Sequence, residues 1–202
     1  MKEKNTTIYL VRHGETDFNS SKIIQGITDN PLNKNGENQA QILRQTFENT
    51  NFDTAYSSHL QRAYLTTEII NNNKAPIIID SSLTERNYGK YEGIPFCEMK
   101  KINESIKEIP FHLLPENKPD PNFETDLEML QRIIPTFKSI SQKHKGETVL
   151  IGSHGGVIRA MMIYFQKINH TDFPKIKNTA YLTIIGKDKK LELLEIHDID
   201  LE

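Results

Sequence analysis

The chain has 202 residues and a formal net charge of −2 at pH 7, with 36% hydrophobic and 26% charged side chains. This length suffices for one domain with a hydrophobic core, and the near-neutral charge gives no electrostatic reason to expect a nucleic acid or a membrane surface as a partner. The single cysteine, Cys97, excludes an internal disulfide. No secretory signal is visible, and no apolar run approaches the ~20 residues of a membrane helix, so we expect a cytoplasmic protein.

Three apolar runs of strand length lie in the first eighty residues, and helical patterns separate them. The predicted strands are Ile8–Val11, Phe52–Tyr56 and Pro76–Ile79, and the predicted helices run from about Glu37 to Phe47 and from the capping pair Ser57-Ser58 to about Ile70. Because strands and helices alternate, we predict an α/β fold, a three-layer sandwich whose mostly parallel central sheet is flanked by helices.

The rest of the chain is expected to contain an irregular loop, further helices and a closing hairpin. In order, these are a functional loop at Leu83–Gly93, a helix at Phe96–Ile109, a helix at Thr125–His144 that Pro135 should kink, a strand at Thr148–Ile151, a helix at Val157–Phe165, and a hairpin of Ala180–Ile185 and Leu191–Ile196. Prolines interrupt the segment before Thr125. We therefore expect residues 96–123 to form a small cap on a single domain that spans residues 1–202.

Two of the predicted strands lead into a histidine. The strand Ile8–Val11 continues into Arg12-His13-Gly14, and the strand Thr148–Ile151 continues into Gly152-Ser153-His154-Gly155-Gly156. In open α/β sheets, ligands bind in the crevice outside the carboxyl ends of the strands. The sequence therefore predicts that His13 and His154 meet there. Arg12 lies beside the first histidine, and Arg62, at the start of a helix that follows a strand, can reach the same crevice.

Histidines and arginines that meet in one crevice can bind a phosphate group. A guanidinium grips two oxygens of an anion, and the helix starts after Ser58 and at Gly155 add N–H groups that favour negative charge. A histidine can attack phosphorus when one ring nitrogen is unprotonated and an acceptor, such as a carbonyl in the Gly14 turn, holds the other N–H. The leaving oxygen needs a proton, for which Glu85 is the candidate donor. The scheme needs neither a metal nor another cofactor, because the arginines and His154 supply the compensating charge.

Five motifs, in order over most of the chain, carry a resemblance to a known family. They are Leu10-Val11-Arg12-His13-Gly14-Glu15-Thr16 followed by Asn19, Gly26 with Asp29-x-Pro31-Leu32, Ser57-Ser58-x-Leu60-x-Arg62-Ala63, Leu83-x-Glu85-Arg86-x-Tyr88-Gly89-x-x-Glu92-Gly93, and Ser153-His154-Gly155-Gly156 with Arg159. Together they resemble the histidine phosphatase superfamily, whose members are phosphoglycerate mutase-like.

The resemblance implies a role for each matching residue. His13 would be the nucleophile that becomes phosphohistidine, and Glu85 would be the proton donor. The groups that would hold the phosphoryl group or contact the substrate are Arg12, Arg62, His154 and Gly155, with Asn19 and Ser58 as secondary contacts.

Two features of the motifs leave alternatives open. Glu15 and Glu92 lie close to the other motif residues and could replace Glu85 as the carboxylate of the site. Pro121-x-x-Glu124-Thr125 resembles a family motif in which glycine usually occupies the position of Phe123, so the shape of that loop is expected to differ. A metal site formed by His13, His154 and Glu85 is a further alternative, although adjacent arginines would repel a cation.

The loop motif with Tyr88-Gly89 and Glu92-Gly93 looks more like phosphatase members than mutases. The pieces that particularly resemble the fructose-2,6-bisphosphatase-like branch are Gln25-Gly26 and Glu85-Arg86-x-Tyr88-Gly89. We therefore expect a metal-independent phosphatase that acts on a small phosphorylated metabolite, such as a sugar phosphate or bisphosphate. The alternatives are a phosphoglycerate mutase and a non-catalytic sensor of a phosphorylated metabolite. A homodimer is one assembly that the sequence leaves open.

Overall fold

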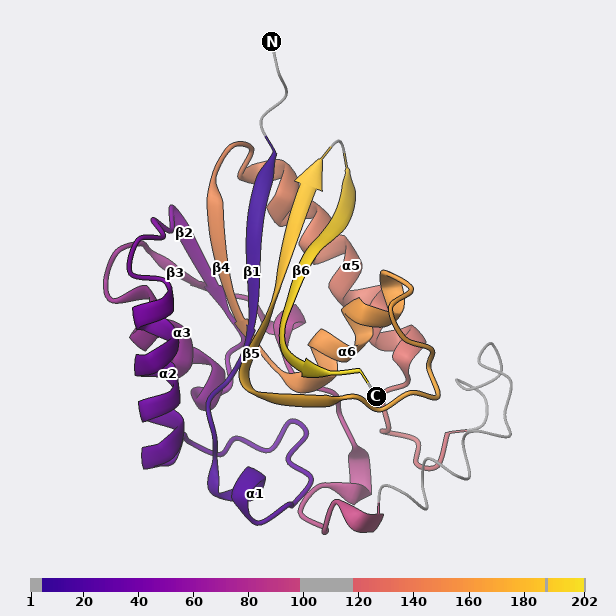
Figure 1. The fold of residues 1–202 in the computed structure, drawn as a ribbon. Coiled ribbons are helices and arrows are strands. Elements are labelled where there is room, and N and C mark those ends of the chain that lie inside the picture. Colours follow the sequence, from indigo (N-terminus) through magenta and orange to yellow (C-terminus); the bar gives the residue numbers. More distant parts are fainter. Residues whose placement is uncertain (1–4, 99–117, 188, 202) are drawn as a thin grey trace.

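The fold is centred on one mixed sheet with helices on both faces (Figure 1). The computed structural model describes residues 5–98, 118–187 and 189–201. Most of the predicted cap at 96–123, and nearly all of the predicted helix Phe96–Ile109, lie outside the described residues. The strands are β1 (Thr6–Arg12), β2 (Thr54–Ser57), β3 (Ile77–Ile79), β4 (Thr148–Ser153), β5 (Lys175–Lys187) and β6 (Lys190–Asp200).

The sheet has the order β3-β2-β4-β1-β5-β6. The first four strands are parallel, and β5 pairs antiparallel with both of its neighbours, β1 and β6. This confirms the predicted α/β fold with a mostly parallel sheet. Both strands of the predicted hairpin are longer than expected, and β5 also pairs with β1 in the centre of the sheet. Its first residues, Lys175 and Ile176, thereby reach the edge at which β1 ends.

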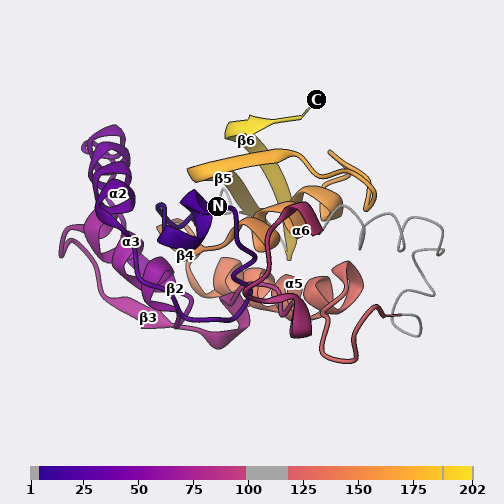
Figure 2. The same ribbon diagram turned by 90° about the horizontal axis from the view of Figure 1, so that it is seen from below.

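Two pairs of helices cover the two faces of the sheet (Figure 2). One face carries α2 (Lys34–Thr46) and α3 (Gln61–Asn71), and the other carries α5 (Asp126–Lys143) and α6 (Gly155–Tyr164); the short elements are α1 (Asp17–Ser20), η1 (Ser81–Leu83) and η2 (Gly89–Tyr91). Successive β4 residues alternate between two hydrophobic clusters: Val149 and Ile151 pack in the α5/α6 cluster, and Leu150 packs in the α2/α3 cluster. The middle residues of β1 (Ile8–Val11) and β4 (Val149–Ile151) are continuously apolar because both faces of the sheet are covered.

The start of α3 differs from the prediction. The helix begins at Gln61, after Leu60, and not directly after Ser57-Ser58. The first N–H of the helix, that of Gln61, donates to Asp29 at 2.8 Å, while Ser58 Oγ accepts only the N–H of Leu60 at 3.3 Å. The capping carboxylate therefore comes from a loop thirty residues earlier. The helix α5 begins with the predicted Thr125 as its N-cap and runs through Pro135.

The pairing of β1 with β4 places both histidines at one edge of the sheet. Arg12 is the register partner of Ser153, and the N–H of His13 donates to Ser153 O at 3.0 Å. His13 and His154 are the next residues of the two strands.

Within the described residues, no helix is both long and apolar enough to span a membrane.

Gly152, near the end of β4, permits close contact between this strand and α3. A Cβ at this position would lie 1.7 Å from Thr67 Oγ1 and 3.1 Å from the carbonyl oxygen of Ala63. The helix that carries Arg62 can therefore pack against the strand that carries His154 only because this position has no side chain.

We predict that Gly152→Ala lowers the free energy of unfolding by about 1–3 kcal/mol, because a methyl group is forced into a packed interface. Chemical denaturation measures the change. Thr67→Ala should partly rescue the variant, since it removes the closest atom but leaves the contact with Ala63. An unchanged stability of Gly152→Ala would contradict the close packing described above.

Candidate active site

His13 is buried at the end of β1 and held in one orientation. Its Nδ1 donates to the carbonyl oxygen of Gly14 at 2.7 Å, as the sequence predicted for a nucleophilic histidine. Burial, followed by the nearby charges of Arg62 and Arg12, lowers the pKa of His13 well below 6.5. The ring is therefore neutral near pH 7, with its proton on Nδ1 and an unprotonated Nε2.

His154 lies beside His13, at the N-cap of α6. The two ring centroids are 5.3 Å apart, with an angle of 61° between the ring planes. Burial, followed by Arg62 and the His13 ring, lowers the pKa of His154 well below 6.5 as well. Both ring nitrogens are buried and make no hydrogen bond within the described part of the chain. Buried polar atoms are normally hydrogen-bonded, and a bound ligand can supply the partner that these ring nitrogens lack.

Two buried arginines provide the charge of the site. Arg12 donates through Nη1 to the carbonyl oxygen of Ile176, and Arg62 donates to the carbonyl oxygens of Thr28 and Gly26 at 2.8 and 2.7 Å. The Nε atoms of both arginines are buried without a hydrogen-bond partner among the described residues. Burial lowers the pKa of each guanidinium, and the nearby Glu85 opposes this effect. The guanidinium groups stay protonated at any physiological pH and make the site attractive to an anion.

Glu85 faces the arginines from the loop after β3. Its carboxylate accepts the N–H of Arg86 at 2.7 Å and the N–H of Gly156 at 3.2 Å. A Cβ at position 156 would lie 2.2 Å from Glu85 Oε1, so the second glycine of the Gly155-Gly156 pair makes room for the carboxylate.

The other two carboxylates considered from the sequence serve different contacts. Glu15 Oε1 accepts from Asn33 Nδ2 at 3.0 Å, and Glu92 binds the loop around Gly26. Of the three glutamates, only Glu85 is among the described residues that line the cavity of the site.

The remaining predicted contact residues occupy different positions. Gly155 lines the cavity, and a Cβ there would lie 3.4 Å from Arg12 Nε. Asn19 closes a capping box with Thr16, and Asn178 Nδ2 donates at 3.2 Å both to Asn19 Oδ1 and to His13 O. Ser58 is fully buried. Asn19 and Ser58 are not among the described residues that line the cavity, and neither are His13, Arg62 and His154, so a direct contact with the substrate remains a prediction for all five.

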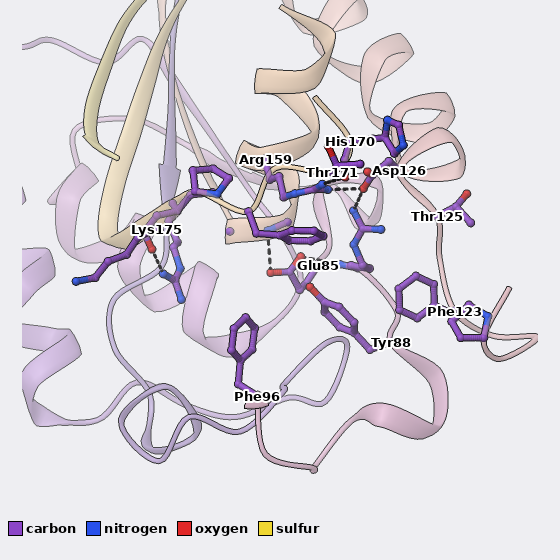
Figure 3. Close-up of a pocket in the computed structure, with 18 residues that line it drawn as sticks. Glu85, Tyr88, Phe96, Phe123, Thr125, Asp126, Arg159, His170, Thr171 and Lys175 are labelled. Carbon is purple, nitrogen blue, oxygen red and sulfur yellow. Dashed lines mark hydrogen bonds and ion pairs between the residues drawn. The ribbon is translucent and has the colours of Figure 1, made fainter. Parts of the chain in front are cut away.

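The structure contains a cavity of about 440 Å³, and Arg12, Glu85 and Gly155 form part of its wall (Figure 3). The sequence did not identify most of its other lining residues, among them Tyr88, Phe96, Phe173, Thr171, Lys175 and Asp126. These residues come from separate segments, and only the position of Tyr88 within the Glu85 motif gave a local signal.

Phe123, the residue that replaces the usual glycine, contributes an aromatic wall to the cavity. Its side chain is buried and lies edge-on to Tyr88, with ring centroids 5.8 Å apart. Burial, followed by the charge of Glu85, raises the pKa of Tyr88 to about 12, so its phenol stays neutral. The departure from the family motif therefore makes this side of the cavity more apolar.

A buried ion cluster lies at one side of the cavity. Asp126 Oδ1 accepts from Arg86 and, at 2.6 Å, from Arg159 (Figure 3). Burial would raise the pKa of Asp126, but the two guanidinium groups lower it. Arg159 also donates to the carbonyl oxygen of Asp172 at 2.9 Å. Each of these two arginines is thus paired directly with a carboxylate, whereas Arg12 and Arg62 donate to backbone carbonyl oxygens. Across residues 5–98, 118–187 and 189–201, no cluster of three histidine, cysteine or acidic residues could hold a metal ion.

Comparisons with known proteins agree with the fold described above. The family model described as "Histidine phosphatase superfamily (branch 1)" matches residues 8–199. The chain is 36% identical over 158 residues to the uncharacterized phosphatase PhoE of Bacillus subtilis, covering 78% of this chain and 76% of the relative. It is 31% identical over 174 residues to a 2,3-bisphosphoglycerate-dependent phosphoglycerate mutase of Cytophaga hutchinsonii, covering 84% and 81%. A solved phosphoserine phosphatase mutant of Entamoeba histolytica, in complex with phosphoserine, superposes with a TM-score of 0.81 at 27% identity, covering 95% and 96%.

We predict that inorganic phosphate stabilises the protein, because it would partner buried cationic groups that otherwise oppose folding. At a concentration about 100 times its dissociation constant, phosphate should raise the melting temperature by roughly 5–10 °C. Differential scanning fluorimetry measures the shift. Arg62→Ala should abolish most of it, whereas Arg44→Ala, on α2, should leave it intact. Equal shifts in both variants would contradict an anion site at Arg62.

Proposed function

Because the chain belongs to branch 1 of the histidine phosphatase superfamily, we propose that it is a phosphatase that hydrolyses phosphate monoesters of small metabolites. The observation that carries this proposal is the state of His13. A neutral imidazole with its Nδ1–H bound to the Gly14 carbonyl presents Nε2 as a nucleophile. Arg12, Arg62 and His154 surround it with the groups that a phosphoryl oxygen would bind.

In the proposed first step, Nε2 of His13 attacks phosphorus and the bond from phosphorus to the ester oxygen breaks. The ester oxygen takes a proton from the Glu85 carboxyl and leaves as an alcohol. The phosphoryl group remains on His13 as phosphohistidine. Arg12 and Arg62 compensate its charge, so the chain's own cations supply the stabilisation that phosphoryl transfer requires.

In the proposed second step, water enters the space that the alcohol has left. The Glu85 carboxylate takes one proton from the water, whose oxygen attacks phosphorus while the bond to His13 Nε2 breaks. Inorganic phosphate is released, and both residues return to their starting states. The position of Glu85 on the cavity wall, where it would lie beside the ester oxygen and later beside the water, supports a single residue acting first as acid and then as base.

The residues that line the cavity favour a substrate whose leaving group has an apolar surface. Tyr88, Phe96, Phe123 and Phe173 line it, and the Asp126 cluster already engages two of its arginines. A second phosphate on the substrate would need a free cation. Lys175 lines the cavity and has no ion pair within the described part of the chain, but its side chain extends away from Tyr88 and Phe123 (Figure 3). We therefore favour a monophosphate over the sugar bisphosphate suggested by the fructose-2,6-bisphosphatase-like motif, and a metabolite screen with both classes would decide.

A mutase and a sensor remain the alternative functions. The Cytophaga relative is described as a mutase, and interconversion of 3- and 2-phosphoglycerate with little free phosphate would favour that activity. Tight binding of phosphate esters without turnover would favour a sensor. The cytoplasmic location and the homodimer considered from the sequence also remain proposals.

We predict that His13→Ala abolishes hydrolysis of p-nitrophenyl phosphate, while His59→Ala, at an exposed position, has no effect. A base with a lowered pKa stays unprotonated to lower pH. The acid-side fall of kcat/KM in the wild type should therefore lie below pH 6.5, after correction for the second ionisation of the substrate near pH 6. Steady-state assays with a metal chelator present provide the measurement. Full activity of His13→Ala, or strict metal dependence, would refute the mechanism.

A second prediction concerns the proton donor. Glu85→Gln should reduce kcat about 10²–10⁴-fold for an alkyl phosphate, whose leaving oxygen needs a proton. The loss should be much smaller for formation of phosphohistidine from p-nitrophenyl phosphate, because p-nitrophenolate leaves without one. Rapid-quench kinetics of the first turnover separates this step from hydrolysis. Equal losses with both substrates would argue against Glu85 as the general acid.

A further inference from the structure

Arg62 is oriented by a loop and not by its own helix. Its two terminal nitrogens donate to the carbonyl oxygens of Thr28 and Gly26, and these bonds leave Nε as the buried nitrogen without a partner among the described residues. The direction in which Arg62 presents its charge therefore depends on the conformation of residues 26–28, which we call the acceptor loop.

The carboxylate of Glu92 holds the acceptor loop from its other side. Oε1 accepts the N–H of Ile27 at 2.9 Å, and Oε2 accepts the N–H of Thr28 at 3.0 Å and its hydroxyl at 2.7 Å. Gly26 has a φ of +57°, and a Cβ there would lie 2.0 Å from Glu92 Oε1. The glycine is therefore required both for the backbone turn and for the approach of the carboxylate.

One peptide group connects the two charges directly. The carbonyl of Gly26 accepts from the Arg62 guanidinium, and the N–H of the same peptide unit, contributed by Ile27, donates to the Glu92 carboxylate. The peptide dipole thus lies between a cation and an anion, and each of its hydrogen bonds is charge-assisted. Bonds of this kind strengthen one another, so loss of the Glu92 charge should weaken the hold on Arg62.

Glu92 also reaches the loop that carries the candidate acid. Its Oε1 accepts the N–H of Tyr88 at 3.1 Å, and Tyr88 lines the cavity beside Glu85. One carboxylate therefore links the acceptor loop of Arg62 to the loop of Glu85. The reaction scheme gives Glu92 no chemical role, and it is not among the lining residues of the cavity.

We propose that Glu92 is a positioning residue, which orients Arg62 for the phosphoryl group through the acceptor loop. The inference rests on the proposed phosphatase function. The segments that carry the two loops have further contacts that hold them together: Gly93 N donates to Ile24 O at 2.8 Å, and Ile24 N donates to Ile94 O at 2.9 Å. Ile24 also belongs to an apolar cluster against which Tyr88, Tyr91 and Ile94 pack. Loss of the carboxylate charge should therefore misplace Arg62 without unfolding the region.

The test uses Glu92→Gln, which preserves size and removes charge. We expect its KM for p-nitrophenyl phosphate and its inhibition constant for inorganic phosphate to rise about tenfold, as loss of charge-assisted hydrogen bonds predicts, with a smaller change in kcat. Asp53→Asn is the matched control, because Asp53 also accepts a backbone N–H, that of Thr148 at 2.8 Å, but at the opposite end of the sheet. The control should leave both constants unchanged.

A double-mutant cycle with Arg62→Lys distinguishes positioning from general stability. Lysine lacks the two-pronged guanidinium, so Glu92→Gln should have little further effect on phosphate inhibition in that background. Full tenfold losses in both backgrounds, or unchanged constants in Glu92→Gln, would overturn the proposal.

A second variant tests the proposal if Glu92→Gln fails to fold. Thr28→Ala, which removes one donor to the carboxylate, should show a smaller rise in KM, and an unchanged KM would overturn the proposal. A wild-type protein that neither binds phosphate nor hydrolyses its esters would instead refute the proposed function.

Discussion

The parallel pairing of β1 with β4 is the constraint on which the site depends. Six consecutive residue pairs, from Thr7 with Thr148 to Arg12 with Ser153, bring the two strands to the same edge in register. Two histidines that are far apart in the sequence then lie one residue beyond paired positions. A shift by one residue would turn the side chains to the opposite faces of the sheet, so the apolar residues of both strands also fix the position of the imidazoles.

The site combines buried cations with neutral imidazoles, an arrangement that is unfavourable without an anion. Burial lowers the pKa of both histidines, and the guanidinium charges of Arg62 and Arg12 act in the same direction. The protein compensates both arginines with backbone carbonyls and with the nearby carboxylate of Glu85, and Arg62 also lies near the carboxylates of Asp29 and Glu92. The Nε atoms of both arginines have no hydrogen-bond partner among the described residues, so the same buried guanidinium groups that help to lower the pKa of His13 also offer donors to a phosphate.

Charge is handled differently on the other side of the cavity. Arg86 and Arg159 share Asp126, and this cluster connects the Glu85 loop, α5, α6 and the segment around Asp172. Its role in the structure is to join elements, and it leaves aromatic side chains such as Phe123 to form much of the cavity wall. The same residue type, arginine, thus serves anion binding at one place and structural cohesion a short distance away.

The sequence by itself determined the fold class and the neighbourhood of the two histidines. Both follow from local patterns: apolar runs of strand length, helical periodicity, and strand ends that lead into Arg12-His13-Gly14 and His154-Gly155. Only the tertiary structure decided that Asp29 caps α3, that backbone carbonyls aim Arg62, and that Glu92 holds the loop which carries them. These contacts join residues thirty or more positions apart through individual backbone groups. No periodicity or motif encodes such pairs, because every residue carries the same N–H and C=O and only the folded chain selects which of them meet.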